Sequence, residues 1–293
     1  MADFKIFTDT TCDLPYTYFD ERGIELISHG FTIDGNTIMD DCGRGAYDLQ
    51  DYYRRVCEEK VIVSTNMPNL DCFLTQFPVH LEQGKDILYL CFSSQLSSTF
   101  MTANMAAKEL GEQYPDRRIV IVDSRCASVG QALFVKMAMK KIEEGADMDE
   151  LIAYCEQLRD QVLHYLVVDD LDHLHRGGRV SKTAAVVGSL LGMKPVLHCN
   201  IEGKILPLDK VRGRKAAIER VLSLIEAEAI NPQENIIHIC HVNCPEDALY
   251  VKEQLTARLS PKEIFVSPVG PVITAHAGPG TLAVIALGKE RRK

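Results

Sequence analysis

Small polar residues and glycines gather in four short stretches of the chain, at the ends of strand-like segments. The stretches are TDTTCD from Thr8, STN from Ser64, SSQLSST from Ser93 and HAGPG from His276. Hydroxyl groups and the first backbone amides of a helix both donate hydrogen bonds to anions, so this combination suits a carboxylate or a phosphate. Each stretch alone is explained by a helix cap, because Ser, Thr and Asp are favoured there. Four of them together predict an anion-binding site.

The segments between these stretches alternate between strand-like and helix-like patterns. In the first half we expect strands at residues 4–8, 86–92 and 118–122, and helices at 97–113 and 127–144. Short apolar strands separated by long helices are typical of βαβ units and a mainly parallel sheet. Loops at the carboxyl ends of parallel strands converge on one crevice, which is where polar stretches of this kind usually bind a ligand.

The second half has a different sequence pattern, in which an apolar strand at 162–168 is followed by a glycine-containing turn, LHRGGR. An apolar helix is expected at 181–192, and Glu202 and Gly203 are expected to form the turn of a hairpin. Further strands are expected at 235–242 and 263–269, and further helices at 212–229 and 246–259. We therefore predict an α/β protein with two α/β domains, residues 1–160 and 161–293, the first with a mainly parallel sheet.

Composition and charge argue against several classes of function. The net charge of −9 leaves no overall basic excess for nucleic acid or for an anionic membrane surface. No apolar run reaches the roughly 18 residues of a membrane-spanning helix, and the amino terminus enters a strand without the pattern of a signal peptide. The ten cysteines are scattered, many of them within apolar segments, as is typical of a reducing compartment. We expect a cytoplasmic protein with no transmembrane segment and no nucleic-acid partner.

Several motifs, taken together and in order, carry a family resemblance that covers essentially the whole chain. They are TDTTCDLP, FSSQLSSTF, VDSRCASVGQ, LHRGGRVS and GPVITAHAGPG. The sequence resembles the DegV family of bacterial fatty-acid-binding proteins, the acyl-carrying component of a fatty-acid kinase system. The resemblance implies two α/β domains with one long-chain fatty acid buried at or near their interface. It implies no other cofactor, no metal and no catalysis by this chain.

The resemblance also implies which residues hold the fatty-acid carboxylate. Carried over by position, these are Thr65, a serine of the pair Ser93 and Ser94, and His276, with Ser64 and Gly278 as supporting residues. The acid's tail, about C14 to C18, would supply the affinity at roughly 0.8 kcal/mol per buried methylene. The polar cluster would fix its orientation and keep the carboxylate hydrogen-bonded.

A separate, ATP-dependent fatty-acid kinase subunit is the partner that the resemblance implies. This kinase would phosphorylate the presented carboxylate to an acyl phosphate. The basic turn of the family corresponds to residues 176–179 here, so Arg176, Arg179 and Arg212 are the candidates for contact with the kinase.

A serine hydrolase acting on an acyl ester is the alternative, because Ser93 or Ser94 follows an apolar strand and His276 could serve as its base. The Gly-x-Ser-x-Gly elbow is absent, however, and no acidic residue is identifiable as the partner of His276. A metal site near His238 and Cys240 is disfavoured, since that segment is strand-like and no second ligand pair follows. No Gly-Lys-Ser or Gly-Lys-Thr loop supports ATP binding by this chain.

Overall fold

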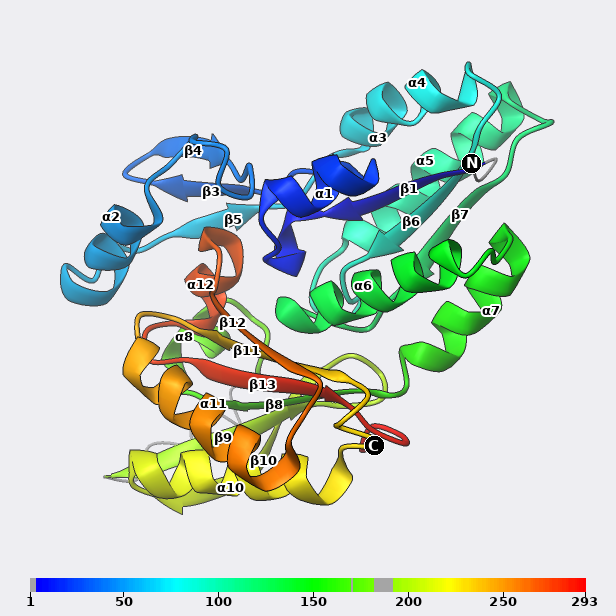
Figure 1. Cartoon of the computed structure of the whole chain (residues 1–293). Helices are drawn as coiled ribbons and strands as arrows, with labels where there is room; N and C mark the ends of the chain where they lie inside the picture. Colours follow the sequence, from blue (N-terminus) through cyan, green and yellow to red (C-terminus); the bar gives the residue numbers. More distant parts are fainter. Residues whose placement is uncertain (1–3, 170, 182–191) are drawn as a thin grey trace.

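The apolar strands of the first half form a parallel sheet, as their pattern predicts. The computed structural model describes residues 4–169, 171–181 and 192–293. The sheet has the strand order β2-β1-β6-β7, and all neighbouring pairs are parallel. Its strands are β1 (Phe4–Asp9), β2 (Glu25–Ile27), β6 (Asp86–Cys91) and β7 (Ile119–Asp123) (Figure 1). The polar stretches that follow β1 and β6 therefore leave the sheet at the same edge.

Helices cover both faces of this sheet because its strands are apolar on both sides. Ile6, Leu88 and Leu90 point to the face covered by α6, whereas Phe7 and Tyr89 point to the face covered by α3 and α5. This alternation is the two-residue period of a strand. The helices of this half are α1 (Tyr16–Arg22), α3 (Leu70–Gln76), α4 (Pro78–Leu81), α5 (Thr99–Gln113), α6 (Val129–Glu143) and α7 (Met148–Leu158).

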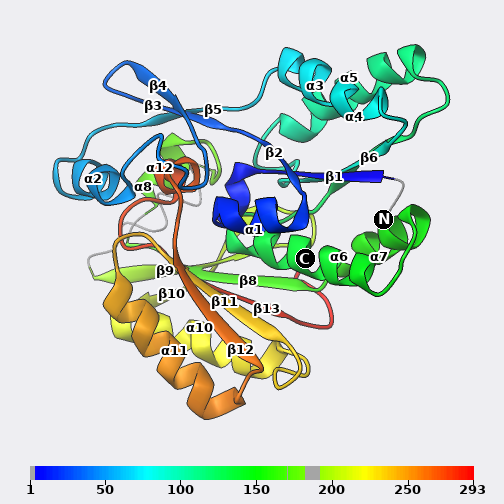
Figure 2. The ribbon, with the colours of Figure 1, turned by 45° about the horizontal axis from the view of Figure 1, so that its top comes forward.

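A small antiparallel sheet extends from the first half toward the second. It consists of β3 (Gly30–Ile33), β4 (Asn36–Met39) and β5 (Ser64–Asn66) in the order β4-β3-β5. Helix α2 (Leu49–Tyr53) and its continuation Arg54–Glu58 lie between β4 and β5 in the chain. Asp34 and Gly35 form the tight turn between β3 and β4, both with positive φ. This sheet contacts α12 (Pro271–Ala277), so it joins the two halves of the chain (Figure 2).

The second half forms a six-stranded sheet with the order β10-β9-β8-β13-β11-β12, in which only β11 and β12 are parallel neighbours. Helices α10 (Arg214–Glu228) and α11 (Pro245–Leu259) cover one face, and α6 of the first half contacts the other (Figure 1). The short helix α8 (Asp172–Arg176) packs against α12. The strands are β8 (Val162–Val167), β9 (Met193–Cys199), β10 (Ile205–Arg212), β11 (Ile236–His241), β12 (Glu263–Pro268) and β13 (Leu282–Leu287).

The two halves share one apolar core, which contains Leu90 of β6, Leu133 of α6 and Ile285 of β13. The α/β fold with a mainly parallel first sheet is confirmed. The domain boundary at residue 160 falls in the turn between α7 and β8, and it stays a prediction because α6 belongs to the core of both halves. The helix expected at 181–192 lies almost wholly outside the described residues. None of the described helices is long and apolar enough to cross a lipid bilayer.

Asp13 joins the halves through a buried carboxyl group. The Gly270 amide, at the start of α12, donates to its Oδ1 at 2.9 Å, and the Ser128 hydroxyl donates to its Oδ2. Burial, the largest cause, raises the pKa of Asp13 to about 8. A similar but smaller effect of burial raises the pKa of the neighbouring Asp40 to about 6. Asp13 therefore holds its proton at neutral pH, which avoids a buried charge at this junction.

We predict that Asp13→Asn makes folding less sensitive to alkaline pH. Because the folded-state pKa of about 8 lies above the unfolded value of about 3.9, the folded state binds the proton more tightly, and stability falls as pH rises toward 8. Between about pH 6.5 and pH 8, the free energy of unfolding of the wild type should fall more steeply than that of the variant, by up to about 1.4 kcal/mol per pH unit. Denaturant unfolding at several pH values measures both slopes.

The matched control is Asp149→Asn, because the Arg118 guanidinium lowers the pKa of this exposed carboxyl, which is therefore ionised throughout this pH range. That variant should keep the wild-type slope. An Asp13→Asn protein whose stability declines as steeply as the wild type would show that Asp13 is not the titrating group.

Candidate ligand-binding cavity

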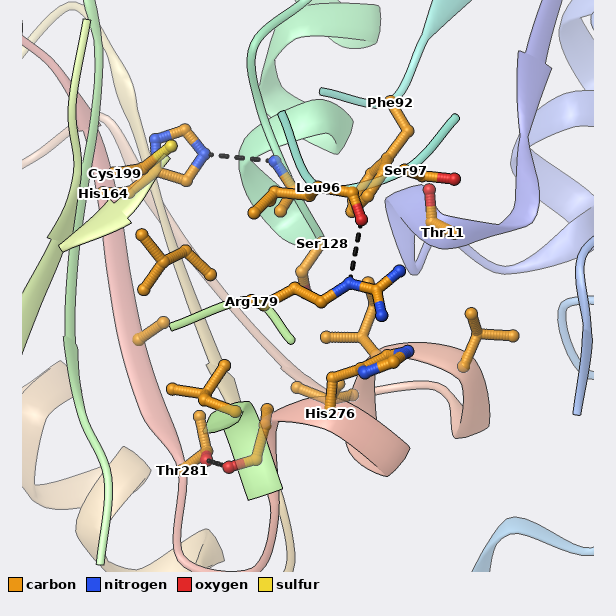
Figure 3. A pocket seen from close by; sticks show the side chains of 18 of the residues that line it. Thr11, Phe92, Leu96, Ser97, Ser128, His164, Arg179, Cys199, His276 and Thr281 are labelled. Carbon is orange, nitrogen blue, oxygen red and sulfur yellow. Dashed lines mark hydrogen bonds between the residues drawn. The ribbon is translucent and has the colours of Figure 1, made fainter. Parts of the chain in front are cut away.

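A cavity of about 260 Å³ lies between the two halves of the molecule. Its wall is mostly apolar and comes from both halves: Phe92 and Leu96 belong to the first half (Figure 3), and Leu166, Ile285 and Ile273 belong to the second. The volume is close to the lower end of the range for small-molecule sites, about 300 to 1,000 Å³. A cavity with this lining suits an apolar ligand with few polar groups.

Thr65 and His276 form a hydrogen-bonded pair at one end of this cavity. Thr65 lies on β5, His276 lies in the last turn of α12, and Thr65 Oγ1 is 2.8 Å from His276 Nε2. Burial, and then the nearby charge of Arg179, lower the pKa of His276 to about 4, so the ring is neutral at pH 7. When the neutral ring carries its proton on Nε2, it donates to Thr65 and leaves the hydroxyl hydrogen free for an anion. The sequence-predicted pair is thus brought together.

The glycine turn before Arg179 sets the position of the His276 ring. A Cβ atom at Gly177 would lie 2.2 Å from His276 Nδ1 and 3.2 Å from the carbonyl oxygen of His173. The backbone of Gly177 therefore touches the ring edge, and Nδ1 is buried with no hydrogen-bond partner in the described part of the chain. Only a residue without a side chain fits at this contact, which fixes the ring in its orientation toward Thr65.

Ser97 and Ser98, rather than Ser93 and Ser94, line the same cavity as this pair. Ser97 Oγ is 2.8 Å from Thr99 Oγ1, which is 3.0 Å from Nε2 of His29. Burial lowers the pKa of His29, so this buried chain of polar groups is uncharged. The sequence held a signal for it, because residues 97–99 stand at the start of the helix α5, where hydroxyl groups meet free amides.

Ser93 and Ser94 form hydrogen bonds away from the cavity. The Ser93 hydroxyl is fully buried and donates to the carbonyl oxygen of Gly203 at 2.9 Å, which fastens the β9–β10 turn to the first half. The Ser94 amide donates to Asp123. Neither serine lines the cavity, and no acidic side chain of the described chain bonds to His276. The serine hydrolase alternative is therefore not supported.

The two predicted supporting residues act from outside the cavity wall. Ser64 precedes Thr65 on β5 and is exposed, because neighbouring residues of a strand point to opposite faces. Gly278 follows α12 with a φ of 79°, and a Cβ atom there would lie 2.7 Å from the ring of His173. Gly278 therefore allows the end of α12 to pack closely against α8.

The three predicted docking arginines fall into two groups. Arg176 and Arg212 are exposed. Arg179 is partly buried, lines the cavity and donates from Nε to the carbonyl oxygen of Leu96 at 2.9 Å. Figure 3 shows its guanidinium group beside the cavity, with the Leu96 carbonyl bonded to it. The sequence did not distinguish Arg179 from its exposed neighbours.

His164 forms another part of the wall, together with Cys199, and sequence reasoning did not find it. Its Nδ1 bonds to the carbonyl oxygen of Val162 at 2.8 Å, and burial lowers its pKa to about 3. A Cβ atom at Gly130 would lie 1.8 Å from His164 Nε2, so the ring fills the space that this glycine leaves. His164 is therefore neutral and fixed. Among the described residues, no group of three or more His, Cys, Asp and Glu side chains could hold a metal ion.

Comparison with known proteins agrees with this architecture. The model of a family described as uncharacterised proteins, DegV family, matches residues 3–289. A DegV domain-containing protein of Clostridium perfringens is 38% identical, with 98% of each chain covered. A protein of Thermotoga maritima named fatty acid-binding protein is 30% identical, with 95% of each chain covered. A solved structure from Thermus thermophilus, described as fatty acid binding of a DegV family protein, has a TM-score of 0.87 and 28% identity, covering 97% of this chain and 99% of that one. The chain therefore belongs to the DegV family.

Proposed function

We propose that this protein binds one long-chain fatty acid in the cavity between its two halves, with the carboxylate at Thr65, His276 and Ser97. The observation that carries the proposal is the combination of an apolar cavity with a hydroxyl–imidazole pair at one end. Relatives whose names or descriptions state fatty acid binding share the fold over almost their whole length. Placing the carboxylate at Ser97 replaces the sequence-based choice of Ser93 or Ser94.

The division of the cavity into a polar end and an apolar body matches the chemistry of a fatty acid. Each buried methylene contributes about 0.8 kcal/mol, so a tail of about C14 to C18 supplies most of the affinity. A carboxylate removed from water needs hydrogen-bond donors, because an unpaired buried charge is strongly unfavourable. Thr65 and Ser97 supply hydroxyl donors for it.

Exposure near the polar end favours an orientation with the carboxylate outward. Met67, two residues after Thr65, lines the cavity and is 44% exposed. Ser98, which follows Ser97, also lines the cavity and is exposed. His164 and Cys199, by contrast, are buried. A carboxylate at the Thr65 end is therefore within reach of a partner protein, while the tail is enclosed.

An ATP-dependent fatty-acid kinase is the partner we infer, since no acidic side chain among the described residues pairs with His276 to make it a catalytic base at the carboxylate. The kinase would form an acyl phosphate on the presented carboxylate. Arg176 and Arg212 are exposed and are our candidates for the docking surface. Arg179, the third candidate for contact with the kinase, also lines the cavity.

The proposed ligand can be identified directly. Protein purified without added lipid is denatured and extracted, and the extract is analysed by mass spectrometry. We expect about one equivalent of a fatty acid of about C14 to C18, the size for which tail burial gives tight binding. A protein that is empty and also takes up neither palmitate nor oleate would contradict the proposed function.

Gly177→Ala should weaken fatty-acid binding, because the new Cβ displaces the His276 ring and breaks its 2.8 Å contact with Thr65. Losing an oriented donor to a charged group costs about 1.5–3 kcal/mol, or roughly a ten- to hundredfold rise in Kd. Displacement of a fluorescent fatty acid measures this change. Gly111→Ala is the matched control, since nothing lies within 4 Å of a Cβ there, and it should keep wild-type affinity. Wild-type affinity in a folded Gly177→Ala protein would argue against the positioned ring.

Charge reversal tests the docking surface separately from binding. Arg176→Glu and Arg212→Glu should keep wild-type fatty-acid affinity but reduce acyl phosphate formation by the kinase about tenfold or more, because reversed charges on an interface slow association. Lys252→Glu, an equal change at an exposed residue of α11, is the control. If both arginine variants support phosphorylation at the wild-type rate, these residues do not form the docking surface.

A further inference from the structure

His29 begins a short chain of hydrogen-bonding groups that ends at a hydroxyl group of the cavity wall. It lies between β2 and β3, lines the cavity and is 3% exposed. Its Nε2 is 3.0 Å from Oγ1 of Thr99, and this Oγ1 is 2.8 Å from Oγ of Ser97. Thr99 is fully buried, whereas Ser97 lines the cavity. The chain His29–Thr99–Ser97 therefore connects a buried ring to a hydroxyl group that can meet a ligand.

Two arrangements of hydrogen atoms are compatible with these contacts, because a neutral imidazole carries its proton on one of two nitrogens and a hydroxyl group donates only once. In the first, Nε2–H of His29 donates to Thr99, and the Thr99 hydroxyl donates to Oγ of Ser97. In the second, the proton is on Nδ1, so Nε2 accepts from Thr99 and the Ser97 hydroxyl donates to Thr99. The first arrangement leaves the hydroxyl hydrogen of Ser97 free, and the second uses it within the chain.

The backbone amide of Thr99 completes the first arrangement. This amide donates to Oγ of Ser97 at 3.2 Å. Together with the Thr99 hydroxyl, it then occupies both lone pairs of the serine oxygen. A serine oxygen that accepts twice can still donate its own hydrogen to a third group, and the cavity is the space that Ser97 lines. The first arrangement therefore turns Ser97 into a donor toward the cavity.

The other ring nitrogen of His29 also favours the first arrangement. Nδ1 is buried and has no hydrogen-bond partner in the described part of the chain. In the first arrangement this nitrogen is a bare acceptor, whereas in the second it is a buried N–H group without an acceptor. Buried N–H groups without a partner are rare in proteins. Burial also lowers the pKa of His29, although the charge of Asp9 opposes this shift, so the ring carries one proton rather than two at pH 7.

We propose that His29 is a positioning residue which, through Thr99, makes Ser97 a hydrogen-bond donor to the ligand's carboxylate. This rests on the proposed function and adds to it a residue that acts through two others. The other hydroxyl donor has a similar neighbour, because Nε2 of His276 faces Thr65 and Nδ1 of the same ring is buried without a partner among the described residues. Each of the two donors is then aimed by a neutral histidine.

The position of the proton on His29 can be measured directly. In protein with ¹⁵N-labelled histidine, the NMR chemical shifts of the ring nitrogens identify the one that carries the proton, and a His29→Gln protein assigns the signals. Spectra are recorded at pH 7 without ligand and with palmitate. We expect the Nε2–H form of His29 with palmitate bound, because only this form leaves the Ser97 hydrogen free. A proton on Nδ1 in the complex would overturn the proposal while leaving fatty-acid binding intact.

Affinity for palmitate gives a second test. His29→Leu removes the ring donor and keeps an apolar side chain in the buried site, so the Thr99 hydroxyl is no longer directed toward Ser97. We expect the Kd to rise about two- to tenfold, the usual range for one neutral hydrogen bond. His29→Gln should recover most of this loss, because its side-chain amide can donate to Thr99. His238→Leu is the matched control, since His238 is equally buried but does not line the cavity, and it should keep wild-type affinity.

A double variant separates positioning from a general effect on the cavity. In Ser97→Ala the positioned donor is absent, so adding His29→Leu should not weaken palmitate binding further. An equal loss with and without Ser97, or wild-type affinity in His29→Leu, would overturn the role of His29 and leave the proposed function standing. A wild-type protein that binds no palmitate would instead overturn the proposed function, and the role of His29 with it.

Discussion

The anchoring of α12 is the constraint on which the binding site depends. Its first turn is held by the first half of the chain, because the Tyr52 hydroxyl donates to the carbonyl oxygen of Pro271 at 2.8 Å and the carboxyl group of Asp13 accepts from the Gly270 amide. The Tyr53 hydroxyl adds a bond of 2.6 Å to the carbonyl oxygen of Val269. The two tyrosine bonds are buried, where exchange with water is excluded and a lost partner is costly. The far end of the same short helix carries His276, so the polar end of the cavity is positioned by contacts about two helical turns away.

Around the cavity, burial raises the pKa of an acid and lowers the pKa values of histidines, and both shifts favour the uncharged form. Asp13 retains its proton because its pKa is raised, and His29, His164 and His276 lose theirs because their pKa values are lowered. In every case the leading cause is desolvation, which disfavours the ionised form. The three histidines of the cavity wall are therefore uncharged at pH 7. Arg179 also lines this cavity. Burial lowers the pKa of its guanidinium, but an arginine stays charged at pH 7 even so.

Sequence reasoning could place the elements of the site but could not choose among neighbouring residues. The motifs that carry the family resemblance were sufficient to name Thr65 and His276, and the structure brings these two residues to one cavity. The choice between Ser93 and Ser97 depends on the loop from β6 to α5, in which Ser93 turns toward Gly203, 110 residues later. No local pattern predicts such a contact. His164 was equally beyond reach, since its place is set by the absence of a side chain at Gly130 on another element.

The hydroxyl groups around the cavity show how one residue type serves two purposes. Thr11 and Ser128 line the cavity, but their hydroxyls donate to the buried carboxyl groups of Asp9 and Asp13. A hydroxyl hydrogen that is already bonded is unavailable to a ligand, so these residues can border an acyl tail without demanding a polar group from it. Thr65 instead faces a ring nitrogen that can itself be the donor, which leaves the hydroxyl hydrogen free for an anion. In the proposed binding mode, the contrast between the head and tail regions is therefore produced by the partners of these hydroxyls, and not by the amino-acid types that line the wall.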